Sequence, residues 1–267
     1  MIKKMGLCFT ALMIFFGIAA CAKENEAAPE KKQPRETAVS AYIDKHYLAK
    51  DGLIIDYQGV KNPHYLSESV GLYMEYLVLV NDSARFHKLY QALERELAVE
   101  DGSKIFIKWE KGANVHVGAF IDDLRIYQAL VEASRNFSYP DYADFADRLI
   151  AAEKKYGTNR NGPVDFFDFD TKQQAKTLHL SYYKVKAMKQ AGFAKTDFDP
   201  LKNVPAAPFF AEIYQNKHYE TTGTEVNMID QMLIANQFFL LTGGEKSEIR
   251  SVSIRTMGAI GTCLRSV

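Results

Sequence analysis

Apolar residues recur at three- and four-residue spacing along most of the chain, and this periodicity constrains the fold more than any other feature. Alternating strand patterns are scarce, and residues 104–109 are the best candidate for a strand. The sequence therefore predicts an all-α protein built of helix pairs joined by longer loops. The predicted helices are residues 37–49, 67–80, 83–99, 118–134, 142–156, 172–190, 208–216 and 226–241.

Residue types at the ends of these segments support the predicted boundaries. A side-chain oxygen can cap the first turn of a helix at Ser67, at Asp82 or Ser83, and at Thr171. Gly157 and Gly192 follow the last turns of two others, and glycine commonly ends a helix.

The first twenty residues are typical of an export signal. Lys3 and Lys4 form a positive start, and the apolar stretch 7–20 is too short to span a bilayer comfortably. It ends in IAAC at residues 18–21, which matches the lipobox of bacterial lipoproteins. We expect Cys21 to carry a lipid that anchors the protein outside the cytoplasm, on the cell membrane. The alternative is an ordinary secretory signal with a chance cysteine.

The remaining chain divides by composition. Residues 21–36 are rich in charge, contain two prolines and lack large apolar groups, which is typical of a flexible tether. Residues 37–244 are long enough to form one domain with a sizeable core. The segment 245–267 contains no aromatic residue and no sustained helical face, and we interpret it as an aberrant tail.

Composition excludes several classes of function. Without residues 1–20 the formal net charge is −2, so no basic surface for nucleic acid is expected. The six histidines are scattered, and the sequence contains no metal-site spacing, P-loop, dinucleotide fingerprint or serine-hydrolase elbow. We therefore expect neither a metal nor another cofactor. The three cysteines, two of them Cys8 and Cys21, provide no disulfide framework.

Carboxylates and aromatic residues gather in four loops that precede predicted helices, at residues 56–69, 108–123, 157–173 and 216–230. Aromatic faces stack on sugar rings, and carboxylates accept hydrogen bonds from hydroxyl groups. If these loops lie at one end of the helical array, they predict a sugar-binding cleft.

Three groups of carboxylates within these loops are candidates for chemistry. Glu68 falls in the first turn of a helix, where it could equally act as a capping carboxylate. Asp122 and Asp123 stand together in an apolar stretch, and the structural alternative is pairing with Arg125 or Lys111. Asp230 is surrounded by apolar residues, so we expect it to be partly buried with a perturbed pKa.

The order of these groups resembles glycoside hydrolase family 8. The motif Ser-Glu-x4-Tyr-Met at residues 67–74 is followed by Trp109 and by Gly-Ala-x-x-Asp-Asp-Leu at residues 118–124. The resemblance runs from about residue 52 to about residue 241 and is closest to lipoprotein members encoded with bacterial exopolysaccharide systems. Ser69, Glu75 and the pair Phe120-Ile121 depart from the usual family pattern.

This resemblance implies an (α/α)6 toroid and an inverting mechanism. It assigns Glu68 as the general acid and Asp123, with Asp122 beside it, as the group that holds the sugar at the bond being cut. The base falls at Asn227 or Asp230, and we choose Asp230 because a carboxylate can take a proton from water. Candidates for stacking on sugar rings, each of which could also be a core aromatic, are Trp109, Tyr65, Tyr73, Tyr182 and Tyr183, and Asn227 is a further candidate for binding substrate.

A full toroid of twelve helices needs more than roughly 300 residues at ordinary helix and loop lengths. The chain has 267, and its last segment does not match the pattern. The sequence therefore predicts a toroid that is incomplete at its C-terminus, leaves the 226–241 helix exposed on one flank and has reduced stability or activity.

Three functions remain open at this point. The leading hypothesis is a membrane-anchored, endo-acting glycosidase that cleaves an extracellular polysaccharide, with an exopolysaccharide synthesis complex as a further partner. The second is a binding lipoprotein on the same fold that has lost cleavage. The third is a helical scaffold lipoprotein, which would expose a large apolar patch.

Overall fold

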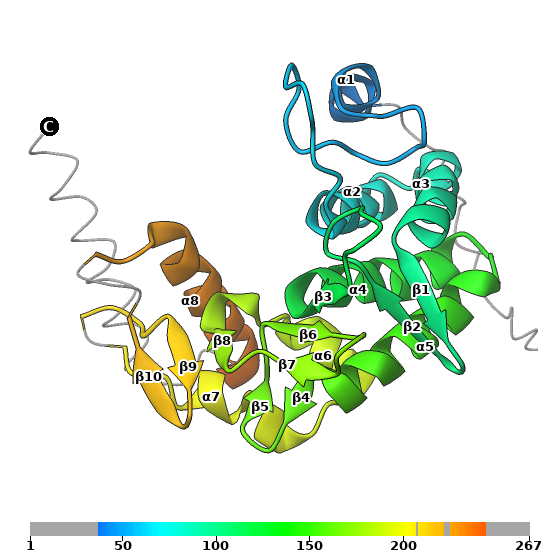
Figure 1. The fold of residues 1–267 in the computed structure, drawn as a ribbon. Helices are drawn as coiled ribbons and strands as arrows, with labels where there is room; N and C mark the ends of the chain where they lie inside the picture. Colours follow the sequence, from blue (N-terminus) through cyan, green and yellow to red (C-terminus); the bar gives the residue numbers. More distant parts are fainter. Residues whose placement is uncertain (1–36, 207, 222–224, 244–267) are drawn as a thin grey trace, which may run out of the picture. The chain divides into compact units, whose positions relative to one another are not determined.

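The computed structural model describes residues 37–206, 208–221 and 225–243 (Figure 1). The signal 1–20, the tether 21–36 and the tail 245–267 lie outside the described residues. In the described part, helices dominate and strands are short. The helices are α1 Ala38–His46, α2 Ser67–Leu79, α3 Ser83–Glu96, α4 Phe120–Asn136, α5 Asp141–Tyr156, α6 Val185–Ala191, α7 Asp199–Lys202 and α8 Met228–Thr242, with 3-10 turns η1 Leu180–Tyr182 and η2 Lys195–Phe198.

Four small antiparallel sheets lie between these helices, so the prediction of an all-α protein is only roughly right. The strands are β1 Ala98–Asp101, β2 Lys104–Ile107, β3 Val117–Ala119, β4 Thr158–Asn159, β5 Gly162–Pro163, β6 Phe166–Asp168, β7 Gln173–Gln174, β8 Thr177–His179, β9 Ile213–Gln215 and β10 His218–Glu220. They pair in the orders β1-β2, β3-β6-β7, β4-β5 and β8-β9-β10. The sheet β3-β6-β7 leads directly into α4, and β8 leads directly into η1.

Two predicted helices are wrong because their apolar spacing fits a strand as well as a helix. Segment 172–190 begins with β7, β8 and η1 and becomes α-helical only from Val185. Segment 208–216 contains β9, and there Leu178 pairs with Tyr214 across the sheet. Short apolar runs do not distinguish the two states, and pairing between distant segments decides between them.

The core lies between the helices of the first half. Helix α2 packs against α3 and α4, and α4 packs against α5. Met74, Leu93 and Leu124 are fully buried there. Gly71 allows the close approach of α2 and α4, because a Cβ at this position would lie 3.0 Å from the Cβ of Arg125. This contact brings the first turn of α2 next to the first turn of α4.

The predicted helix boundaries are partly confirmed. Asp82 caps α3 by accepting a hydrogen bond from the backbone NH of Arg85, and Gly192 ends α6 in the left-handed conformation, at φ 70°. The prediction that Ser67 caps α2 is wrong, because Ser67 is the first residue of this helix and its hydroxyl donates to Asp122. No helix begins at Thr171, whose backbone NH donates to the Asp168 carboxylate.

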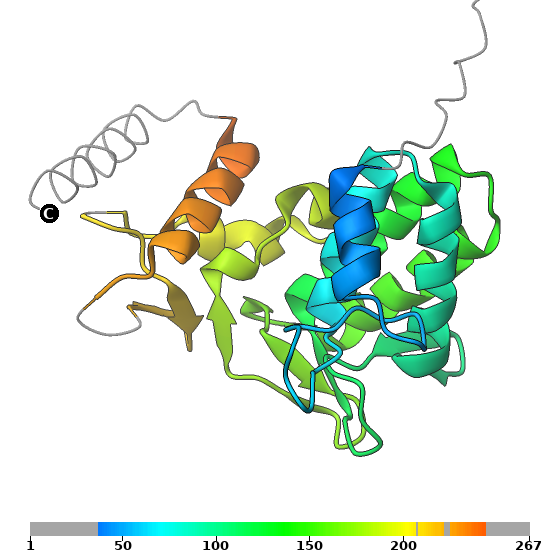
Figure 2. The same cartoon turned by 90° about the horizontal axis from the view of Figure 1, so that it is seen from above.

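Helix α8 lies beside α6 and α7 (Figure 2). Its outer face is apolar and exposed: Met232 is 66 % exposed and Phe239 is 53 % exposed, and Leu233 and Leu240 lie on the same face. The exposed flank predicted for this helix is therefore present. Within the described ranges, no helix is long and apolar enough to cross a membrane.

Candidate active site

Carboxylates from four segments lie close enough to Tyr182 for their charges to act on its hydroxyl group. Burial raises the pKa of Tyr182, and the negative charges of Asp165, Asp122, Asp230 and Glu68 raise it further. Glu68, Asp122 and Asp230 stand in the first turns of α2, α4 and α8. The fold therefore brings the charges of three acids, spread over residues 68–230, within electrostatic reach of Tyr182.

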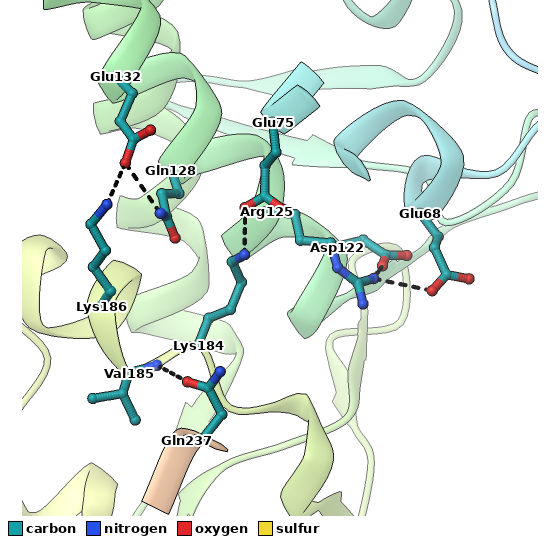
Figure 3. A network of polar contacts seen from close by, with 10 residues as sticks. All are labelled: Glu68, Glu75, Asp122, Arg125, Gln128, Glu132, Lys184, Val185, Lys186 and Gln237. Atoms are coloured by element: carbon teal, nitrogen blue, oxygen red, sulfur yellow. Dashed lines mark hydrogen bonds and ion pairs between the residues drawn. The ribbon is translucent and has the colours of Figure 1, made fainter. Parts of the chain in front are cut away.

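Arg125 joins two of these acids. Its Nη1 donates to Asp122 Oδ1 at 2.7 Å and to Glu68 Oε1 at 3.2 Å (Figure 3). Ser67 Oγ donates to Asp122 Oδ2 at 2.8 Å. Burial raises the pKa of Asp122 to about 6, although the charge of Arg125 and the Ser67 hydrogen bond act in the opposite direction. The predicted alternative of pairing with Arg125 is confirmed for Asp122, whereas Lys111 pairs with Asp51 and Glu96.

Asp123 occupies a different environment from Asp122. It is 1 % exposed, and its carboxyl group interacts with the buried carboxyl group of Glu153 on α5. Adjacent helical positions point about 100° apart, so only one of the two acids can lie beside Glu68. The resemblance assigned the sugar to Asp123, with Asp122 beside it. Both acids are buried, but Asp122 shares Arg125 with Glu68, whereas Asp123 faces Glu153.

Glycines at two positions leave space for the Asp123–Glu153 pair. A Cβ at Gly157 would lie 2.2 Å from Glu153 Oε2, and a Cβ at Gly118 would lie 3.2 Å from Asp123 Oδ2. Gly157 ends α5 as predicted, with an ordinary φ of −81°. We interpret the pair as two carboxyl groups that share a proton in the protein interior.

This pair should make stability depend on pH. Burial raises the pKa of Glu153 to about 7 from 4.5, and burial together with the charge of Glu153 raises the pKa of Asp123. The folded protein then retains a proton that the unfolded chain releases, so stability falls as pH rises from 4.5 through about 7. We expect the free energy of unfolding, measured with urea, to fall by about 3 kcal/mol across this range.

The variant Glu153→Gln should reduce this pH dependence, although burial still raises the pKa of Asp123, and should be more stable than the parent at pH about 8. Asp147→Asn, which changes an exposed acid on the same helix, is the matched control and should keep the parent slope. An unchanged slope in Glu153→Gln would show that the buried pair does not titrate in this range.

The start of α8 is fixed by buried polar contacts. Asn227 Oδ1 accepts from the backbone NH of Ile229, and its own backbone NH donates to Glu212 Oε1 at 2.8 Å. Gln231 Nε2 also donates to Glu212 Oε1, at 3.0 Å. Asn227, predicted to bind substrate or to occupy the base position, therefore caps the helix, and half-buried Asp230 follows in its first turn.

The sequence did not predict a second pair of polar residues at this candidate site, Asp165 and His179. Asp165 accepts from Thr177 Oγ1 at 2.6 Å, from the His179 backbone NH at 2.6 Å and from His179 Nδ1 at 2.8 Å. Burial acts to raise the pKa of Asp165, but these hydrogen bonds outweigh it and lower the pKa. The hydrogen bond to Asp165 raises the pKa of His179, as do the charges of Asp230 and Glu212.

The predicted aromatic residues have different positions. Trp109 is 41 % exposed and is held at the start of α2, where its carbonyl accepts from the backbone NH of Ser67. Tyr65 is half-buried with Lys111 over its ring, and Tyr73 and Tyr183 are core residues. The sequence analysis missed Phe166, which is 47 % exposed on β6 beside the start of α4. The signal that could have identified Phe166 is the alternation along this segment, in which Phe167 and Phe169 are buried and Phe166 is exposed.

Three further polar contacts join the start of α6 to α2, α4 and α8. Lys184 forms an ion pair with Glu75 of α2, and Lys186 donates to Glu132 of α4 at 2.7 Å (Figure 3). The backbone NH of Val185 donates to Gln237 of α8 at 2.8 Å. Glu75, which departs from the family pattern, is therefore explained by its cationic partner. Over the residues placed by the structure, no cluster of His, Cys, Asp and Glu could hold a metal ion.

Comparison with known proteins identifies relatives across most of the chain. PssZ from Listeria monocytogenes is 46 % identical, with a TM-score of 0.76, and the match covers 81 % of this chain and 69 % of that one. YdaJ of Bacillus subtilis strain 168, whose name describes a lipoprotein, is 29 % identical over 89 % of this chain and 69 % of its own length.

More distant structures share the fold. Endoglucanase Cel10 from Klebsiella pneumoniae, a family 8 glycosyl hydrolase, is 19 % identical, with a TM-score of 0.59 over 79 % of this chain and 75 % of that one. The sequence matches no protein-family model. The identity and coverage shared with PssZ, together with the fold shared with Cel10, place this chain in the family of PssZ, a divergent branch of the proteins with the glycoside hydrolase family 8 fold.

Proposed function

We propose that this chain is a membrane-anchored extracellular glycoside hydrolase that cleaves within a polysaccharide chain and inverts the anomeric configuration. The observation that carries the proposal is the joining of Glu68 and Asp122 by Arg125, with the charges of Asp165 and Asp230 also reaching Tyr182. Hydrolysis of a glycosidic bond requires two carboxylates, and Glu68 and Asp230 come from the first turns of two different helices. The fold shared with Cel10, a glycosyl hydrolase, supports the same reaction class.

Each group has a role in this proposal. Glu68, whose side chain is 52 % exposed, donates the proton to the departing glycosidic oxygen. Asp230 takes the proton from the attacking water on the opposite face of the sugar. Asp122, which is oriented by Ser67 and Arg125, holds the sugar. The family resemblance had assigned this role to Asp123. Trp109 provides an exposed ring on which a sugar unit can stack.

One observation favours a second function, a polysaccharide-binding lipoprotein that no longer cleaves. The ion pair between Arg125 and Glu68 exists only when Glu68 is ionised, whereas a general acid must carry a proton. The shorter bond from Arg125 goes to Asp122, which lets Glu68 leave the pair when substrate binds.

The test is incubation of the detergent-solubilised chain with a panel of bacterial exopolysaccharides and β-glucans. Cleavage would appear as new reducing ends, and proton NMR of the first products would give their anomeric configuration. New ends with inverted configuration support the glycosidase. Binding without new ends supports the binding lipoprotein, and neither binding nor cleavage would contradict both functions.

Anchoring is tested separately, through Cys21. The variant Cys21→Ser lacks the thiol that accepts the lipid, so we expect the protein to leave the membrane fraction. Fractionation followed by immunoblotting measures this. Cys263→Ser, which removes a cysteine outside the lipobox, should stay with the membranes like the parent. Membrane association that survives in Cys21→Ser would refute the lipobox interpretation.

A further inference from the structure

His179 is held in one orientation by its contacts with Asp165. Asp165 has a 6 % exposed side chain and receives both the backbone NH and the ring Nδ1 of His179. Thr177 Oγ1 adds a third hydrogen bond to the same carboxylate. These contacts leave the imidazole with little freedom to rotate and direct Nε2 away from Asp165.

The pair is also tied to the carboxylates of the candidate site. The backbone carbonyl of Asp165 accepts from the NH of Phe120, which is the first residue of α4. The ring of His179 lies against Tyr182, with a centroid distance of 5.2 Å. The charged groups that face the imidazole are Asp165, Asp230 and Glu212.

The outer nitrogen of His179 is available for a ligand. The imidazole is 34 % exposed, and its Nε2 has no partner among the residues that the structure describes. Three surrounding carboxylates favour the protonated ring, in which both nitrogens donate hydrogen bonds. Nε2 of His179 is therefore an oriented donor beside Tyr182, within electrostatic reach of Asp230 in the first turn of α8.

We propose that His179 is a substrate-binding residue whose Nε2–H donates to a hydroxyl oxygen of the sugar unit next to Asp230. This inference rests on the proposed glycosidase function and adds a contact on the side of the base. Because the donor is charged and its orientation is fixed, the site should bind a sugar that presents a hydroxyl group there more tightly than one that lacks it. A purely structural pair, joining β8 to the preceding loop, would affect stability alone.

The test uses oligosaccharides of the polysaccharide that the parent cleaves. The variant His179→Ala should raise the dissociation constant, measured by calorimetry, by about tenfold or more, as expected for loss of a hydrogen bond from a charged group. His179→Gln keeps a neutral donor and should recover part of this loss. Binding to the parent should weaken as pH rises through the raised pKa of His179, and neither variant should show this change.

The matched control is His218→Ala, which removes an exposed histidine from β10 of the same sheet and should leave binding unchanged. If the parent cleaves but His179→Ala and His179→Gln bind with parental affinity and pH dependence, the inference is overturned and the proposed function stands. If the parent neither binds nor cleaves any polysaccharide, both are overturned.

Discussion

Replacing Glu68 by glutamine is expected to lower turnover by about 10²–10⁴-fold and to leave polysaccharide binding close to that of the parent. Glutamine has nearly the same shape, and its carbonyl oxygen can still accept from Arg125, so the local geometry should persist. It cannot donate the proton that the departing glycosidic oxygen needs. Initial rates of reducing-end formation and calorimetric titration with oligosaccharide measure the two quantities separately.

The control for this variant lies two turns further along the same helix. Glu75→Gln also separates a carboxylate of α2 from its cation, Lys184, but it removes no group from the candidate site. We expect its turnover to remain within about twofold of the parent, because the ion pair of Glu75 with Lys184 includes none of the proposed catalytic acids. Equal turnover in Glu68→Gln and the parent would remove Glu68 from the mechanism.

The sequence predicted the long helices well, because their apolar residues repeat over three or more turns. Segments 67–80, 142–156 and 226–241 match α2, α5 and α8 to within about two residues. The strands were missed, apart from β2, because each is two to four residues long. Strands this short gain their stability from pairing with distant segments, which periodicity within one segment does not reveal.

The site was predictable only where neighbouring residues carried a signal. Glu68 and Asp230 were proposed from motifs at helix starts, and the charges of both raise the pKa of Tyr182. The assignment between Asp122 and Asp123 could not be predicted, since it depends on whether Ser67 and Arg125 or Glu153 faces each side chain. In this case the rotation of α4, fixed by its packing on α2 and α5, decides which acid is available.

The Asp165–His179 pair was missed for a related reason. Fourteen residues and two strands separate its members, and neither belongs to a recognisable motif. The backbone places them together, since the NH of Asp165 donates to the carbonyl of Thr177 at 3.0 Å. Burial of the carboxylate then selects the histidine as its partner, because a buried charge needs hydrogen bonds.

Arg125 shows how one cation can support two different acids. Its charge favours the ionised form of Asp122, the form that the proposed sugar contact uses, and the same guanidinium contacts Glu68 at the start of α2. Gly71 makes this arrangement possible by allowing α2 and α4 to approach closely. The candidate site therefore depends on the packing of two helices as much as on the acids themselves.

Replacing Asp230 by asparagine is expected to lower turnover by about 10²–10⁴-fold, since an amide cannot accept the proton of the attacking water. Its cost in stability should be small, about 0.3–1 kcal/mol, because the variant loses only a charge at a helix N-terminus.

The competing assignment is tested by Asn227→Asp. A new carboxylate there would lie beside Glu212 Oε1, which already accepts from the backbone NH of Asn227, so we expect no gain in turnover. Initial rates of both variants, with urea unfolding to confirm that each is folded, decide between the assignments. Parental turnover in Asp230→Asn, with faster cleavage in Asn227→Asp, would move the base from Asp230 to position 227.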